Sequence, residues 1–177
     1  MFCRDEGSRH RHFGTVFVLV LLAQIDEALG GEPGQPVQVA RASNLPSIVV
    51  RAVQDAASKL ATPACREIFS DFRDVGGNTL QRNLDALGVS GADYLGWTLF
   101  YDGQGKRICE SRGILAATSP GSRAVFVCTE QFSAVAHREP GLAAALIIHE
   151  ELHSLGLGER PPDSKAITAQ VIARCGK

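Results

Sequence analysis

Apolar residues recur at helical spacing in the segment 47–60, SIVVRAVQDAASKL, at Val49, Val50, Val53, Ala56, Ala57 and Leu60. This spacing puts them on one face of a helix, so the segment is predicted to be an amphipathic helix. Thr62 and Pro63 predict the start of a second helix, because threonine caps a first turn and proline fits the first helical position. The buried face of that second helix would carry Cys65, Ile68, Phe69 and Phe72.

Short apolar runs separated by turn residues fill the middle of the chain, after a short predicted helix over 79–87 that ends at Gly88. Aromatic and β-branched residues in such runs are typical of strands, and the turn-forming residues 102–105 favour a hairpin. We expect strands over 94–101, 106–109, 114–118 and 124–128. The last predicted helices are 142–155, the most apolar of the chain, and 164–174. Helices, a small mainly antiparallel sheet and further helices predict an α+β fold.

The first thirty residues have the pattern of a signal peptide. Basic residues at Arg4, Arg9 and Arg11 precede an apolar stretch over 13–23, which is shorter than the roughly 20 residues that cross a bilayer. The alternative for this stretch is a buried first strand or helix. We expect 1–30 to be removed, 31–46 to be a flexible linker rich in proline, glycine and polar residues, and 47–177 to be the folded domain. The protein would then be secreted or periplasmic, with no stable membrane anchor after cleavage.

Composition and charge exclude several classes of partner. The 177 residues are 45% apolar and 21% charged, which is typical of a globular chain, and the net charge is -1. A nearly neutral chain has no global field that would attract nucleic acid or an anionic membrane. We expect a monomer that binds no nucleic acid.

The cysteine count points to disulfides. Loss of the leader would remove Cys3 and leave four cysteines, and an even number in an exported protein predicts two disulfides with three pairings open. Cys109 and Cys128 end and begin predicted strands separated by a turn, which favours Cys109–Cys128 and leaves Cys65–Cys175. The alternative, four thiols as metal ligands, lacks any CxxC or CxxxC spacing.

The most apolar predicted helix ends in His149-Glu150-Glu151-Leu152-His153, which has the form HExxH. A spacing of four residues puts both imidazoles on one helical face, as two ligands of one metal require. Glu150 lies beside the first histidine and can reach a water on that metal without being a ligand. Zinc lowers the pKa of its water toward about 7, so that a carboxylate can take the proton. The apolar run 142–148 before the motif argues against a surface helix with charged residues in chance register.

Residues 149–159, HEELHSLGLGE, resemble the zincin metallopeptidases, and more closely the metzincin form HExxHxxGxxH. The resemblance implies a zincin-like catalytic domain over 47–177 that holds one catalytic Zn²⁺. It implies His149, His153 and Glu159 as metal ligands and Glu150 as general base. Gly156 stands at the position where the metzincin helix stops and the chain turns back, and glycine readily adopts the left-handed conformation that ends a helix.

The chain departs from this family pattern in two ways. The third ligand would be a glutamate, and Met1 is the single methionine, so the methionine turn found beneath the metal of metzincins is missing. A glutamate ligand from a later helix, as in gluzincins, is excluded because no glutamate follows Glu159. Asp163 is the remaining downstream acid, but it can also cap the last helix. Glu159 is the favoured third ligand and Asp163 the alternative.

The sequence gives little indication of the other residues of the site. By resemblance and by order, the predicted strand 124–128 would present a substrate as the edge of the sheet. Residues with a polar group that could stabilise an oxyanion are Tyr94, Tyr101, Arg123 and His137. We expect Glu151 to face solvent or to pair locally, and Trp97 to lie in the core.

These observations predict an exported zinc-dependent hydrolase, a peptidase acting on a peptide or protein substrate. In this reading Glu150 activates a zinc-bound water that attacks an amide carbonyl. The alternative is a non-catalytic, metal-stabilised binding domain on a zincin-like fold. A further alternative is an enzyme whose cleft is completed by a partner protein.

Overall fold

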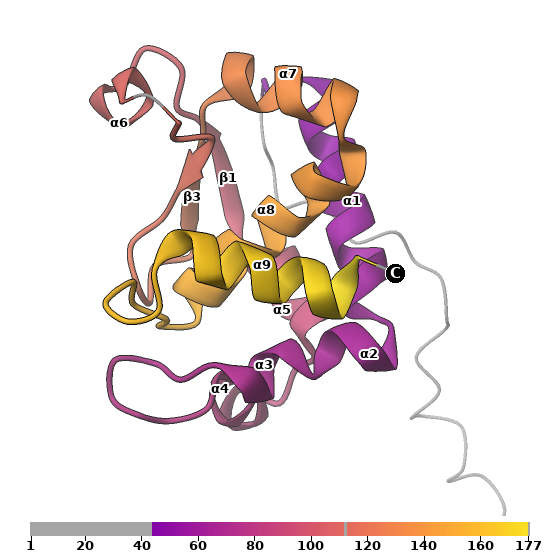
Figure 1. Cartoon of the computed structure of the whole chain (residues 1–177), viewed down its shortest axis with the longest axis vertical. Helices are drawn as coiled ribbons and strands as arrows, with labels where there is room; N and C mark the ends of the chain where they lie inside the picture. Colours follow the sequence, from indigo (N-terminus) through magenta and orange to yellow (C-terminus); the bar gives the residue numbers. More distant parts are fainter. Residues whose placement is uncertain (1–43, 112, 177) are drawn as a thin grey trace, which may run out of the picture. The chain divides into compact units, whose positions relative to one another are not determined.

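The computed structural model describes residues 44–111 and 113–176, which belong to one compact unit of the chain. Its helices and one small sheet form an α+β fold, as the apolar pattern predicts (Figure 1). The predicted signal peptide over 1–30 and almost all of the predicted linker lie outside the described residues. The elements in chain order are α1 (Ser47–Leu60), α2 (Pro63–Arg66), α3 (Ile68–Asp71), α4 (Leu80–Leu87), α5 (Gly91–Trp97), β1 (Leu99–Asp102), α6 (Arg107–Glu110), β2 (Ala116–Ala117), β3 (Ala124–Val127), α7 (Thr129–Arg138), α8 (Pro140–Ser154) and α9 (Ser164–Cys175).

The N-terminal helices begin where local signals predict them, but the second predicted helix is divided at Glu67 into α2 and α3, and Phe72 lies after its end. Helix α1 has the predicted bounds and buries the expected apolar face except Val50, which is partly buried. The Thr62 hydroxyl accepts a hydrogen bond from the Cys65 amide, and Pro63 occupies the first position of α2. Helix α4 ends at Gly88, whose φ of 69° is left-handed. Capping and hydrophobic spacing therefore determine this half of the fold.

The sheet differs from the prediction. Its strand order is β1-β3-β2, with β1 parallel to β3 and β2 antiparallel to it, so the sheet is mixed rather than mainly antiparallel. The predicted hairpin is wrong because Ser90 and Asp93 form a capping box that places residues 94–97 in α5. The return segment is also helical, since residues 107–110 form α6. Helix α7 was not predicted.

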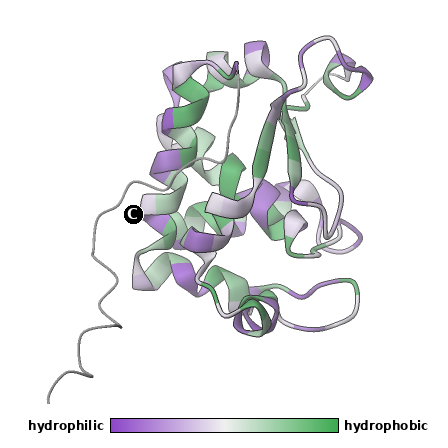
Figure 2. Cartoon of the chain, turned by 180° about the vertical axis from the view of Figure 1, so that it is seen from behind, coloured by the Kyte–Doolittle hydropathy of each residue, from purple (hydrophilic) through white to green (hydrophobic). Residues whose placement is uncertain are grey.

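Helix α8 runs through the core. It packs against α1, α7 and α9 (Figure 1) and against β2, and its residues 147–154 are all buried. Figure 2 shows the two longer strands as predominantly hydrophobic. A helix that is apolar on nearly all sides is expected to be enclosed in this way, and enclosure holds its side chains in fixed positions.

Two disulfides connect the elements. Cys65–Cys175 joins α2 to α9, and Cys109–Cys128 joins α6 to the start of α7. These are the two pairings that the spacing favours, although Cys109 reaches Cys128 from a helix and not across a hairpin. Across residues 44–111 and 113–176, no helix combines the length and the apolar character needed to cross a membrane.

Candidate metal centre

Two histidines of α8 form the base of the candidate site. Pro140 starts the helix, and His149 and His153 follow on one face, one turn apart. Both are buried, at 3% and 5% exposure, and their Nε2 atoms lie 2.9 Å apart. The packed helix therefore aims both ring nitrogens at one point.

Glu159 completes the group from the turn that follows α8. The chain leaves the helix through Gly156, whose φ of 109° suits only glycine. The Glu159 carboxylate then lies 3.2 Å from His153 Nε2 and 3.7 Å from His149 Nε2. Ligands at about 2.1 Å from a tetrahedral zinc are about 3.4 Å apart. The spacing of these three side chains therefore fits a metal ion, and the group can hold one.

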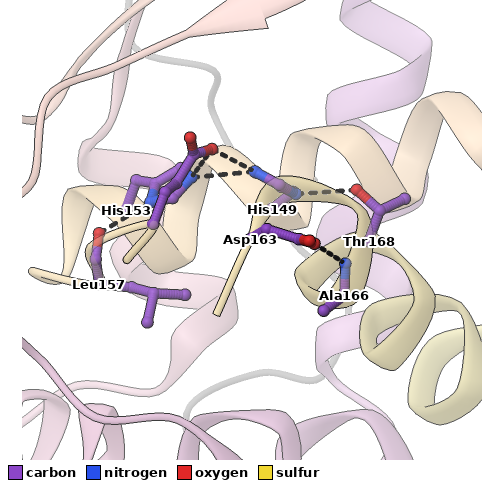
Figure 3. Close-up of polar contacts among 7 residues, drawn as sticks. His149, His153, Leu157, Asp163, Ala166 and Thr168 are labelled. Carbon is purple, nitrogen blue, oxygen red and sulfur yellow. Dashed lines mark hydrogen bonds and ion pairs between the residues drawn. The ribbon is translucent and has the colours of Figure 1, made fainter. Parts of the chain in front are cut away.

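The outer nitrogens of both imidazoles have hydrogen-bond partners (Figure 3). His153 Nδ1 lies 2.8 Å from the carbonyl oxygen of Leu157. A carbonyl only accepts, so Nδ1 carries the proton and Nε2 of the neutral ring keeps its lone pair. His149 Nδ1 lies 2.9 Å from the hydroxyl of Thr168 on α9. Such contacts orient metal-binding histidines and fix their tautomers.

Burial keeps His149 neutral. Desolvation, assisted by the neighbouring His153, lowers the pKa of His149 to about 4. A protonated imidazole cannot bind a metal, so the neutral form is the competent one. The site is therefore ready to accept a cation at neutral pH.

Glu150 is a buried acid. Burial, and secondly the charge of Glu159, raises the pKa of Glu150 to about 8, although the Thr118 backbone amide opposes this. Among the described residues, no group donates a hydrogen bond to Glu150 Oε2. A bound cation would favour the carboxylate and lower this pKa. Glu150 can therefore exchange a proton beside the metal group.

Asp163 has a different role. Its carboxylate accepts a hydrogen bond from the Ala166 amide at 2.8 Å and caps α9 (Figure 3). It does not belong to the group formed by His149, His153 and Glu159. Of the two acids that the sequence leaves open, the structure brings Glu159 to the histidines.

A cleft of about 430 Å³ opens over the group. Its walls include His149, Glu150, His153 and Glu159, together with residues 113–118. These residues contain β2, which is the edge strand on this side of the sheet, whereas β3 is central. The expectation that 124–128 forms the edge beside the site is therefore wrong: β2 has that position.

None of the four suggested oxyanion residues lines the cleft. Tyr94 is buried, and its hydroxyl donates to the Ser154 carbonyl oxygen. Tyr101 stacks on Phe126 and is 45% exposed. Arg123 and His137 are exposed elsewhere on the surface.

Two further expectations are wrong. Glu151 is fully buried, and neither carboxylate oxygen has a hydrogen-bond partner among the described residues. The position follows from the packing of other elements around the C-terminal half of α8, which the motif alone does not reveal. Trp97 is 43% exposed, because α5 ends there and the chain turns into β1.

Thr168 is a site residue that sequence reasoning missed. It follows the buried Ile167 on α9, and nothing in its spacing relates it to His149. The packing of α9 on α8, secured by Cys65–Cys175, brings the two together.

Comparison with family models, curated proteins and solved structures finds no match for this chain.

Proposed function

We propose that the protein is a zinc-dependent hydrolase that cleaves amide bonds in peptides. One observation carries the proposal: Glu150 lines the same cleft as the three candidate ligands and has a carboxylate oxygen without a hydrogen-bond partner. Glu151 also has unpaired carboxylate oxygens but does not line the cleft, so its place beside the three candidate ligands is what distinguishes Glu150. An acid left free beside a metal group is suited to proton transfer.

The donor set favours zinc in an open site. Two imidazole nitrogens and one carboxylate oxygen are ligands that zinc accepts, and catalytic zinc sites use three protein ligands. Within the part of the chain that the structure describes, His149, His153 and Glu159 form a group of three, and Asp163 is occupied as a cap. This leaves room for a reacting group and argues against the closed four-ligand site of a purely structural metal.

The proposed mechanism assigns a task to each side chain. His149, His153 and Glu159 hold the metal, which when bound acidifies water and polarises a carbonyl. Glu150 accepts the proton of the attacking water and then gives it to the leaving amine nitrogen. The burial that raises the pKa of Glu150 in the absence of a cation also makes its protonated form accessible for this second transfer.

The cleft suits an extended chain. Ala116 and Ala117 of β2 present small side chains beside the site, and β2 is an edge strand. A substrate segment that lies along this strand would bring its carbonyl toward Glu150. The two disulfides support an extracytoplasmic location, where such bonds persist.

The adjacent glutamates provide a matched test. Glu150→Gln should abolish zinc-dependent cleavage of a denatured protein substrate, while the variant still binds about one equivalent of zinc. Glu151→Gln, which alters a carboxyl outside the cleft, should retain cleavage. Persistent turnover by Glu150→Gln would overturn the mechanism. A zinc-loaded wild type that cleaves no unfolded protein would favour the non-catalytic binding domain.

A further inference from the structure

A polar loop between α3 and α4 is organised around one carboxylate. Asp74 Oδ1 accepts hydrogen bonds from the amides of Gly76 and Asn78, both at 2.9 Å. Asp74 Oδ2 accepts from the side-chain amides of Asn78 at 3.3 Å and Asn83 at 3.0 Å. The hydrogen bonds, that from Asn83 foremost, lower the pKa of Asp74. The loop is therefore held rigid by its own contacts.

This loop is attached to the turn that ends the histidine helix. Asn83 Nδ2 uses its second proton to donate to the Leu155 carbonyl oxygen at 3.0 Å. The Val75 amide donates to the Gly156 carbonyl oxygen at 3.1 Å. A Cβ at Gly156 would lie only 3.0 Å from Asp74 Cβ. Two hydrogen bonds thus brace two consecutive residues of the turn, and the loop leaves no room for a side chain at Gly156.

The same turn supplies two features of the candidate metal centre. The Leu157 carbonyl accepts the His153 Nδ1 proton at 2.8 Å, and Glu159 follows two residues later. Val75 is 81% exposed, so burial of its side chain does not explain why the loop lies here. Hydrogen bonds from Val75 and Asn83 connect the loop and α4 to the turn.

We infer that Asp74 and Asn83 are positioning residues, which act through the Leu155–Leu157 turn to orient His153 and place Glu159. This inference rests on the proposed metal site. The loop supports the turn from outside the cleft. Metal affinity should therefore depend on residues that touch neither the metal nor a ligand.

Asn83→Leu removes both amide donors while keeping the size of the side chain. Its zinc affinity, measured by competition with a chromogenic chelator, should fall by about 10-fold or more, as for other contacts that orient ligands. Asp74→Asn keeps the size of the side chain but replaces one acceptor oxygen by an amide donor, so it should show a loss in the same direction. This second variant keeps the inference testable if Asn83→Leu does not fold.

Leu84→Val is the control for general destabilisation. Leu84 is buried on the same helix as Asn83, at 1% exposure, but among the described residues it makes no hydrogen bond to the turn. This variant should lower the thermal midpoint of the metal-free protein and leave the zinc affinity of the folded protein within about twofold of wild type. Asn83→Leu should in addition reduce the rise in midpoint that zinc produces.

The outcomes separate the inference from the function on which it rests. Wild-type affinity in folded Asn83→Leu and Asp74→Asn, with zinc still bound by the wild type, would overturn the positioning role alone. An affinity loss in Leu84→Val equal to that in Asn83→Leu would also overturn it. Failure of the wild type to bind zinc would instead overturn the proposed metal site.

Discussion

The imidazole of His153 donates its Nδ1 proton to the carbonyl oxygen of Leu157, four residues further along the chain at 2.8 Å. The turn between them also carries the chain to Glu159, which lies 3.2 Å from the other nitrogen of the same ring. One local structure thus orients one candidate ligand and delivers another. The six residues after the HExxH motif are therefore as important to the site as the motif itself.

Gly156→Ala tests this turn. The φ of 109° and the 3.0 Å approach of Asp74 to an added Cβ both oppose a side chain, so we expect a loss of about 1–3 kcal/mol in the free energy of unfolding and weaker zinc binding. Gly141→Ala is the matched control, because an added Cβ there meets nothing within 4 Å. The control should be neutral or slightly stabilising by urea denaturation. Equal behaviour of the two variants would contradict the role of the turn.

Thr168→Val tests the partner of the other histidine. It keeps the side-chain shape but removes the hydroxyl that lies 2.9 Å from His149 Nδ1. The imidazole then loses its orienting contact, and zinc affinity should fall by about 10-fold in chelator competition. Thr168→Ser retains a hydroxyl and should restore most of the affinity. Unchanged affinity in Thr168→Val would show that the packing of α8 alone orients the ring.

The two disulfides should differ in their contribution to stability. Cys65–Cys175 closes a loop of 110 residues and Cys109–Cys128 a loop of 19. Loop-closure entropy predicts about 5 and about 3 kcal/mol for the two. Paired replacement by serine, followed by urea denaturation, should therefore destabilise the protein more for Cys65 and Cys175. The reverse order would show that local packing outweighs loop length.

Glu151 should weaken the fold as pH rises. Burial raises its pKa well above 4.5 in the folded protein, so the unfolded chain ionises first and is favoured above that pH. Its stabilising neutral state is fully populated below 4.5 and is lost as pH increases. The free energy of unfolding of metal-free Glu151→Gln should equal that of the wild type near pH 4.5. Above that pH the variant should become more stable than the wild type, by at most about 1.4 kcal/mol per pH unit. A difference in the free energy of unfolding between the two proteins that stays constant from pH 5 to 7 would contradict this.

Local signals in the sequence predict much of the helical structure. The caps at Thr62 and Asp163, the apolar spacing of 47–60 and the stop at Gly88 give bounds close to those observed. The HExxH spacing brings His149 and His153 together, and Gly156 marks the turn toward Glu159. Each of these features depends on residues that are only a few positions apart in the chain, so the sequence alone is enough to predict it.

Features that depend on distant segments are not predictable in the same way. The parallel pairing of β1 with β3 requires the chain to cross back over residues 103–123, and no local pattern specifies that path. Thr168 and Asn83 reach the site through helix packing. Glu151 has the charge of a surface residue but lies on the C-terminal half of α8, around which other elements pack. Hydrophobic spacing describes one helix at a time and does not report such contacts.

Zinc stoichiometry tests the central claim most directly. At a free zinc concentration that just saturates the wild type, equilibrium dialysis with metal analysis should find about one equivalent in the wild type and in Asp163→Asn, which keeps the α9 cap. Glu159→Ala should bind well below one equivalent. A wild type that retains no zinc, or a loss of zinc in Asp163→Asn but not in Glu159→Ala, would contradict a metal centre built from His149, His153 and Glu159.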